Sequence, residues 1–412
     1  MLNMANRRVD KKGRTLSKGV TFDANRNRYR YTYNDVLGHR KSIYAISYED
    51  LRERMKDLQR NQMDGLDVYL SGKADVNFVF DRYLASKTGL RGTTKTNYIY
   101  MYDKFIRNGF GKKKIAKIKY SDVLFFYKEL LKEMQINTIE VINNVLRPTF
   151  ELAVRDEIIR NNPVNGTLNE LKKSGEYTVG KRKALTREQQ DAFFQIINEP
   201  NHIRWSNLFT VMFGTGLRVG EFTALRWDDC DFENRVINIT HSLSYYPQFD
   251  KDFKCAYRMG EPKTKAGIRT IPMLDKVYEA LLNERAYQEA NNKRCTNEID
   301  GFSGFIFFNK FGNVHNQSSL NSAIQRLITK YNMDEELKAK KEKRKPIIIP
   351  HFTCHVVRHT FCTRLYENDV DIKTTQSIMG HTDVQTTLDI YADISEEKKK
   401  AVFTALNNNG VV

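Results

Sequence analysis

The chain has 412 residues, and its 67 Lys and Arg against 50 Asp and Glu give a formal net charge of +17 at pH 7. A charge of that size and sign indicates a polyanionic partner such as a nucleic acid, and the absence of any apolar run near the roughly 18 residues of a membrane-spanning helix argues against a membrane protein. The 5 cysteines are odd in number and include no CxxC pair, which argues against a disulfide framework and predicts a reducing, cytoplasmic compartment.

The first segment, residues 1–72, is strongly basic and is predicted to form a small three-stranded sheet backed by one helix. Three short runs are β-prone, within 19–22, 28–33 and 41–46, and 48–62 has the apolar spacing of a helix. Side chains alternate along a strand, so we expect the arginines of the middle run on one face and its tyrosines on the other. We expect the basic face to lie in a DNA groove, the alternative being a solvated strand with no ligand. The expected DNA contacts are Arg26, Arg28, Arg30 and Lys41.

Residues 74–170 are predicted to form a helical unit. Apolar residues recur at helical spacing within 76–86, 93–108, 121–133 and 139–155. Hydroxyl and lysine side chains stand at both ends of the second of these helices, and helix ends are favourable places for a phosphate. Solvated side chains without a ligand are an equal alternative at any one of these positions. The candidates are Thr94, Lys95, Lys112 and Lys113.

A polar stretch, 161–185, is predicted to be a linker, and a capping box formed by the sequence TREQ opens the third segment at Thr186. This segment, 186–412, begins and ends with helical patterns. Between them lie β-prone runs at 236–239, around Tyr245 and at 269–272, and the charged sequence KAKKEKRK (338–345) is expected to be a surface loop. Together the patterns predict a mainly α protein with small β-sheets, an α+β class with three domains: 1–72, 74–170 and 186–412.

Two arginines in the third segment have the contexts expected of a phosphate clamp. Arg218 lies in GTGLRVGE, a glycine-punctuated stretch that leads into a helix, and Arg358 lies in HVVRHTF. A guanidinium group donates two parallel hydrogen bonds and stays protonated, which suits it to the charge that develops on phosphate oxygens. Glu221, three residues after Arg218, is expected to anchor that arginine.

The remaining candidates supply a nucleophile and proton transfer. Tyr391, in LDIYAD, can attack phosphorus if neighbouring cations or a base lower the pKa of its phenol. His381, in MGHTD, can hydrogen-bond the phosphate, and His355, three residues before Arg358 on a helix, can exchange a proton. The ammonium group of Lys263, in a predicted β-hairpin tip with sequence PKTKAG, can protonate a departing oxygen.

A zinc site is the alternative reading of the histidine-rich stretch. His351, His355 and His359 recur every four residues beside Cys354, as metal-binding side chains on a helix do. The stretch lacks the glutamate of an HExxH motif, and an arginine on the same turn would repel the cation. We therefore predict no metal and no cofactor.

The joint pattern R…K…HxxR…GH…Y resembles that of the tyrosine recombinases, also called site-specific integrases. TGLRVGE matches the first arginine box of that family, and HVVRHTF with MGH and the following tyrosine match the second. The basic N-terminus and its tyrosine-rich strands are similar to those of integrases of conjugative transposons.

This resemblance implies a DNA strand transferase that needs neither metal nor ATP. It makes Tyr391 the nucleophile, Arg218 and Arg358 the phosphate clamp, and His355 and His381 the supporting groups. Either Lys263 or Lys265 would be the general acid, because the length of the hairpin varies in the family, and Lys265 would otherwise contact DNA.

The resemblance also implies partners. They are double-stranded DNA at arm-type sites, bound by 1–72, and at core sites, bound by 74–170 and 186–412. Four copies would assemble through a four-way junction, with an accessory protein controlling direction. The apolar residues of the C-terminal segment (Val402, Phe403 and Leu406) would pack on a neighbouring subunit or on their own domain.

Three other functions compete with this one. A type IB topoisomerase uses a similar set of side chains on one duplex. A DNA-binding regulator with the same fold would need neither Tyr391 nor Arg358. A basic RNA-binding protein is the third, although the chain has no RNP-type or KH-type signature.

Overall fold

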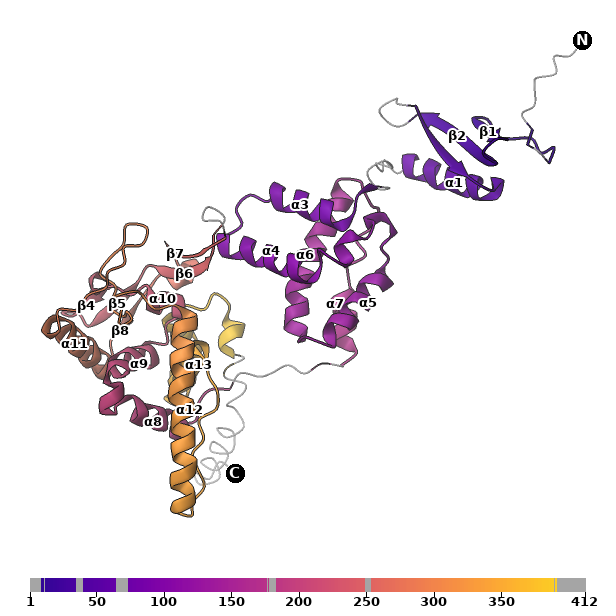
Figure 1. Ribbon diagram of the computed structural model, residues 1–412. Coiled ribbons are helices and arrows are strands. Elements are labelled where there is room, and N and C mark those ends of the chain that lie inside the picture. Colours follow the sequence, from indigo (N-terminus) through magenta and orange to yellow (C-terminus); the bar gives the residue numbers. More distant parts are fainter. Residues whose placement is uncertain are drawn as a thin grey trace, which may run out of the picture. The chain divides into compact units, whose positions relative to one another are not determined.

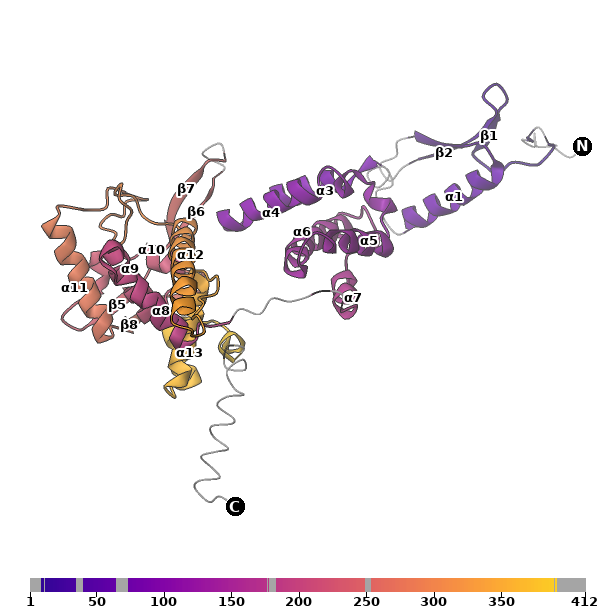
Figure 2. The ribbon, with the colours of Figure 1, turned by 60° about the horizontal axis from the view of Figure 1, so that its bottom comes forward.

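The computed structural model (Figures 1 and 2) divides into two compact units, 1–179 and 180–412. The two units have separate hydrophobic cores. The residues it describes are 9–10, 12–34, 40–63, 73–175, 177, 183–248, 253–388 and 390. Helices predominate in both units, and the strands form small antiparallel sheets, as the sequence predicts. No described helix is long and apolar enough to cross a membrane.

The N-terminal part of the first unit is a three-stranded antiparallel sheet covered by one helix. The strands lie in the order β1 (Val20–Asp23), β2 (Arg28–Asn34) and β3 (Arg40–Ala45), and α1 (Tyr48–Met63) follows. A small core of its own joins sheet and helix; it includes Val20, Tyr29, Ala45, Tyr48 and Leu51. Alternation along β2 therefore turns Tyr29 inward and leaves Arg30 exposed.

Two of the predicted DNA contacts do not share the exposed face of this sheet. Arg26 lies in the turn before β2, where its backbone N–H donates to Asp23 Oδ1 at 3.1 Å, so the strand begins only at Arg28. Lys41 pairs with Tyr33 in the β2–β3 register, which places it on the tyrosine side of the sheet by alternation. Tyr44, which pairs with Arg30 and is exposed, is a β3 residue that shares the basic face of the sheet.

The rest of the first unit is helical. Its helices are α3 (Val76–Ser86), α4 (Gly92–Phe105), α5 (Tyr120–Leu131), α6 (Ile136–Arg155) and α7 (Thr167–Lys173), with short 3-10 turns at Phe110–Lys112 and Ile115–Lys117. Helix α6 is the central element, because α3, α4, α5 and α7 all contact it. Val145, Leu146 and Phe150 of this helix are fully buried.

Helix α7 corrects the predicted linker, which was expected to begin at residue 161. The sequence NNPVNG does end the preceding helical run, but Gly166, at φ +84°, restarts the chain as a helix. Leu171 then packs into the core of the first unit and is fully buried. A helix of seven residues with one core leucine is too short for periodicity alone to reveal.

The second unit combines helices with two small sheets. The helices are α8 (Arg187–Ile197), α9 (Ile203–Thr215), α10 (Val219–Thr223), α11 (Asp275–Ala290), α12 (Gln317–Lys341), α13 (Cys354–Glu367) and α14 (Ile372–Met379). The strands β4 (Cys230–Asp231), β5 (Val236–Ile239) and β8 (Arg269–Pro272) form one sheet, and β6 (Ser242–Pro247) pairs with β7 (Cys255–Gly260) in a hairpin. Helix α9 is central, because α8, α11 and α13 all pack against it (Figure 1).

Local signals at the start of the second unit predicted its structure well. Thr186 and Gln189 form the predicted capping box, each accepting from the backbone N–H of the other at 3.1 Å. The three β-prone runs are strands β5, β6 and β8, whereas β4 and β7 were not predicted. Strand β4 has two residues, and β7 alternates too weakly for a period of two to be visible.

Two predictions about the second unit are wrong, those for the segments PKTKAG and 338–345. The sequence PKTKAG is the connection from β7 to β8 and contains a 3-10 turn, Lys265–Gly267, rather than a hairpin tip. The charged run 338–345 is half helix, because α12 continues to Lys341. Beyond the end of α12, Arg344 forms an ion pair with Glu335, a buried residue of that helix. This ion pair allows the charged segment to pack against α12.

Candidate active site

Arg218 is held where two helices of the second unit meet. Gly216 ends α9 with φ +58°, a conformation that glycine adopts without strain, and Arg218 then becomes the N-cap of α10. Its Nη1 donates to Glu221 Oε1 at 2.8 Å, and its Nη2 donates to the carbonyl oxygen of Gly380 at 2.7 Å. About a third of the side chain, 34%, remains exposed, so the guanidinium group is both fixed and accessible.

Arg358 lies in the middle of α13 and is almost fully buried. It donates through Nη1 to the carbonyl oxygen of Gly216 at 2.9 Å, and through Nη2 to that of Met379. Burial, and secondarily the charge of Arg218, lowers the pKa of Arg358 to about 9. The group therefore stays protonated at neutral pH, and α13 brings a second cation beside the first.

Arg269 is a third arginine in this cluster, and the sequence analysis missed it. Its Nη2 donates to Glu221 Oε2 at 3.0 Å, and its Nε donates to the carbonyl oxygen of Ile378 at 2.7 Å. No motif marked it, since it stands at the start of a β-prone run and arginines there are usually solvated. The sequence predicted Glu221 as a partner of Arg218 alone, and only the structure shows that this carboxylate is buried and therefore needs a second cation.

The end of α14 ties the three arginines together. Its last two residues and its C-cap, Ile378, Met379 and Gly380, each offer a carbonyl oxygen to a different arginine. These carbonyls lack partners within the helix and carry the negative end of its dipole, so cations bind them favourably. The arginines and the turn that follows α14 are therefore positioned by one set of contacts.

Glu221 is the carboxylate of the cluster. Burial raises its pKa, but the charges and hydrogen bonds of Arg269 and Arg218 outweigh burial and hold the pKa below its usual value. Glu221 is thus ionised at neutral pH. Three guanidinium groups around one carboxylate leave an excess of positive charge, which suits the site to an anion.

His381 follows Gly380 directly and is buried, with 8% of its surface exposed. Its Nδ1 lies 2.9 Å from Thr387 Oγ1. Burial lowers its pKa to about 4, helped by the nearby charges of Arg358, Arg218 and Arg269, so the ring is neutral at pH 7. A neutral imidazole can donate one hydrogen bond to a phosphate oxygen without adding charge.

The other predicted groups lie on the surface of the second unit. His355 is exposed in the first turn of α13, one turn before Arg358, and its charge also acts on His381. Lys263 and Lys265 are both exposed in the β7–β8 connection, so the general acid is still one of two alternatives. Among the described residues, no group of three His, Cys, Asp or Glu is arranged to hold a metal ion.

Tyr391 lies outside the described residues, as do Val402, Phe403 and Leu406 of the C-terminal segment. The residue before it, Ile390, is described. It packs against a small core formed by Phe361, Cys362 and Met379. The chain at position 390 is therefore adjacent to α13 and to the end of α14, where the arginines bind.

The predicted contacts of the first unit are at its surface. Arg28 stacks over the ring of Tyr44 at 4.2 Å, on the exposed face of the sheet that also holds Arg30. Thr94 and Lys95 lie in the first turn of α4, and a phosphate contact there stays a prediction. Lys112 and Lys113 are exposed at the 3-10 turn after α4, where Lys113 stacks on Phe110.

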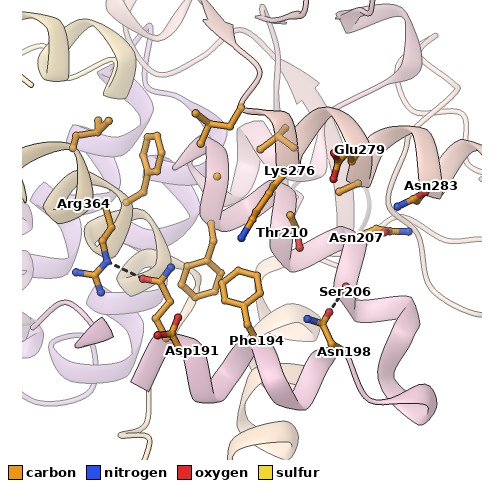
Figure 3. Close-up of a pocket in the computed structure, with 18 of the residues that line it drawn as sticks. Asp191, Phe194, Asn198, Ser206, Asn207, Thr210, Lys276, Glu279, Asn283 and Arg364 are labelled. Atoms are coloured by element: carbon orange, nitrogen blue, oxygen red, sulfur yellow. Dashed lines mark hydrogen bonds between the residues drawn. The ribbon is translucent and has the colours of Figure 1, made fainter. Parts of the chain in front are cut away.

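A separate cavity of about 810 Å³ lies between α8, α9, α11 and α13 (Figure 3). Phe194, Phe213 and Phe361 line its apolar part, and none of the three clustered arginines belongs to its lining. In its wall, Arg364 donates through Nε to Gln190 Oε1 at 2.9 Å. The cavity is thus a feature of the helical packing behind α13, distinct from the arginine cluster.

Comparison with known proteins places this geometry in a family. A family model, the phage integrase family, matches residues 183–398. The transposase from transposon Tn916 of Enterococcus faecalis is 31% identical over 98% of this chain and 98% of that protein. A XerC-like tyrosine recombinase of Caldanaerobacter subterraneus subsp. tengcongensis is 24% identical over 90% of this chain and 92% of its own.

Solved structures agree. The Tn1549 transposon integrase in complex with transposon right end DNA has a TM-score of 0.68 and 26% identity, covering 81% of this chain and 100% of that one. A lambda integrase tetramer bound to a Holliday junction has a TM-score of 0.51 at 16% identity over 90% of this chain and 97% of that one, a likeness of fold.

The chain therefore belongs to the phage integrase family, and it is a tyrosine recombinase. Within that class it resembles the integrases of conjugative transposons, as the sequence motifs predicted.

Proposed function

We propose that this protein integrates and excises a mobile element by cutting and rejoining DNA strands through a 3′-phosphotyrosine intermediate. The observation that carries the proposal is the arginine cluster at the end of α14, with Ile390 packed beside it. The residue that follows Ile390 is Tyr391, so a tyrosine directly continues a chain held next to the anion site.

In the proposed reaction, the phenol oxygen of Tyr391 attacks a backbone phosphorus and the bond to the 5′ oxygen breaks. Arg218 and Arg358 stabilise the charge on the phosphate oxygens, and neutral His381 donates a hydrogen bond to one of them. Lys263 or Lys265 protonates the leaving 5′ oxygen, and His355 takes or returns a proton. Attack by the 5′ hydroxyl of the partner strand releases the tyrosine, so neither ATP nor a metal is required.

The partners follow from the same proposal. The sheet of the first unit would bind arm-type DNA through Arg28, Arg30 and Tyr44, and the helices of that unit would bind core sites with the second unit. The related Tn1549 integrase has been solved with transposon end DNA and lambda integrase as a tetramer on a Holliday junction, which supports duplex DNA and a tetramer as partners. We further propose that an accessory protein controls excision and that the protein acts in the cytoplasm. We also propose that the chain forms three separate domains. Its C-terminal segment would pack on a neighbouring subunit or on its own domain.

The test is a suicide-substrate assay with a nicked duplex that carries the ends of the host element. Wild-type protein is expected to form a covalent protein–DNA product in the presence of EDTA, and Tyr391→Phe is expected to bind the DNA and form none. Tyr278→Phe, which alters a tyrosine of α11 that stacks under Arg235, is the matched control and should keep the product. Product from Tyr391→Phe would mean a different nucleophile and would refute the assignment.

A type IB topoisomerase would give the same covalent product. Strand exchange between two duplexes distinguishes the two activities, because a topoisomerase relaxes one supercoiled duplex without exchanging strands. Recombinant product from two end-bearing duplexes supports the proposal, and relaxation alone would contradict it.

A further inference from the structure

The strongest unassigned group in the second unit is Arg269, because its three side-chain nitrogens are all engaged by the protein. Nε donates to the carbonyl oxygen of Ile378 at 2.7 Å, Nη1 to that of Gly267 at 2.9 Å, and Nη2 to Glu221 Oε2 at 3.0 Å. The side chain is 6% exposed. A buried arginine with this many partners organises what surrounds it, since each contact fixes a different segment.

The three segments that Arg269 joins each carry a group of the proposed reaction. Gly267 ends the 3-10 turn that begins at Lys265, within the connection that also holds Lys263. Glu221 holds Arg218. Ile378 lies three residues before His381. Arg269 therefore lies between the candidate general acid, the first clamp arginine and the histidine turn.

Only an arginine fits this position. The planar guanidinium group presents several N–H donors at fixed angles, whereas a lysine offers one nitrogen that cannot reach three acceptors in different directions. The backbone at Gly380 passes close to the guanidinium group of Arg269: a Cβ added at Gly380 would lie 3.0 Å from Arg269 Nη1. The absence of a side chain at 380 leaves room for the guanidinium group.

We propose that Arg269 is a positioning residue, which holds the β7–β8 connection, the Glu221–Arg218 pair and the His381 turn in one arrangement competent for strand cleavage. This inference rests on the proposed function. Arg269 is expected to act through these neighbouring groups, because Nε, Nη1 and Nη2 all donate to protein oxygens. Its role is expected to show in the rate of the chemical step rather than in DNA affinity.

Arg269 also acts on the site through its charge. Together with Arg358, Arg218 and His355 it contributes to the low pKa of His381, which burial lowers most. Removing this cation is expected to raise the pKa of His381 from about 4 toward its ordinary value. A residue that only stabilised the fold would not act on that titration, so the pKa of His381 is a specific readout.

The experiment compares full-length wild type, Arg269→Met and Arg269→Lys. Cleavage is followed in a single turnover on the suicide substrate at saturating protein, below the melting temperature of every variant. Arg269→Met is expected to cleave about 10- to 100-fold more slowly, the cost of a site displaced by about an ångström, with DNA affinity within about threefold of wild type. Arg269→Lys, which keeps the charge, should recover part of that rate, and the NMR titration of the His381 ring should shift upward only in Arg269→Met.

Arg344→Met is the matched control, because Arg344 also pairs with a buried carboxylate, Glu335, and lies just beyond the end of α12, outside the arginine cluster. It is expected to lower the melting temperature while leaving the cleavage rate and the His381 titration unchanged. Cleavage by Arg269→Met at the wild-type rate, or an equal loss of rate in Arg344→Met, would overturn the positioning role alone. A wild-type protein that forms no covalent product would overturn the proposed function, and this inference with it.

Discussion

At the scale of single residues, the buried cations of the site stay protonated because their guanidinium groups donate hydrogen bonds to backbone carbonyl oxygens. Arg358 is 5% exposed, yet it donates to the carbonyls of Gly216 and Met379, which lie at the ends of α9 and α14. The C-terminal ends of helices carry partial negative charge, so their carbonyls offset part of the desolvation cost of Arg358 without a second carboxylate. A carboxylate in their place would neutralise the positive charge that an anion needs.

Arg358→Lys tests this balance. The environment that lowers the pKa of Arg358 to about 9 would act on a lysine whose ordinary pKa is about 10.4, and would bring that lysine pKa near neutrality. The variant is therefore expected to lose about 10²- to 10³-fold in cleavage rate at pH 8, as when one preorganised donor is removed. Because a lowered lysine pKa leaves the charged form only at low pH, part of the rate should return as pH falls toward 6. The measurement is single-turnover cleavage between pH 6 and 9; a loss that is the same at every pH would refute the titration argument.

At the scale of secondary-structure elements, two glycine C-caps decide where the functional side chains stand. Gly216 and Gly380 both have positive φ, end α9 and α14, and offer their carbonyl oxygens to Arg358 and Arg218. Sequence reasoning found both glycines through the motifs GTGLR and MGH, because a glycine before a new turn is a strong local signal. Arg269 gave no such signal, since its importance comes from three partners distant in sequence. Helix α7 and strand β4 were missed for a simpler reason, because both are too short to show a period.

Gly380→Ala and Gly301→Ala separate backbone strain from steric contact. Both glycines have positive φ, but a Cβ at Gly380 would lie 2.8 Å from the carbonyl oxygen of Ala266, whereas nothing lies within 4 Å of one at Gly301. Gly301→Ala is expected to lower the free energy of unfolding by about 1 kcal/mol through strain alone. Gly380→Ala should cost about 2 to 4 kcal/mol, because the contact with a backbone oxygen adds to the strain. Urea denaturation of the two variants checks this, and equal losses would mean that the chain at 380 relaxes freely.

At the scale of the whole molecule, charge predicted the kind of partner and periodicity predicted the fold class. A net charge of +17 indicated a polyanion, and the mainly α class with small sheets follows from the observed patterns. Contacts divide the chain into units 1–179 and 180–412, and the first has separate cores for its sheet and for its helices. The finer division at residue 72 stays a prediction. A domain boundary is a place that few contacts cross, and no local sequence pattern encodes those contacts. Tyr391 could be proposed as the nucleophile only because a motif of spaced residues is more specific than any one of them.

Removal of residues 1–72 tests that division. The truncated protein is expected to lose binding to arm-type repeats, since Arg28, Arg30 and Tyr44 form the exposed face of the only sheet described in the first unit. Binding to a core site should persist but weaken, because cations that neutralise phosphates are lost with the segment. The dependence of log affinity on log salt should become less steep by roughly 0.9 for each phosphate contact removed. Full-length Arg28→Ala/Arg30→Ala is the matched control and should lose arm binding while keeping the core-site affinity. Gel-shift titrations on both DNA sites across a salt series give all of these values, and arm binding that survives the truncation would place that activity elsewhere in the chain.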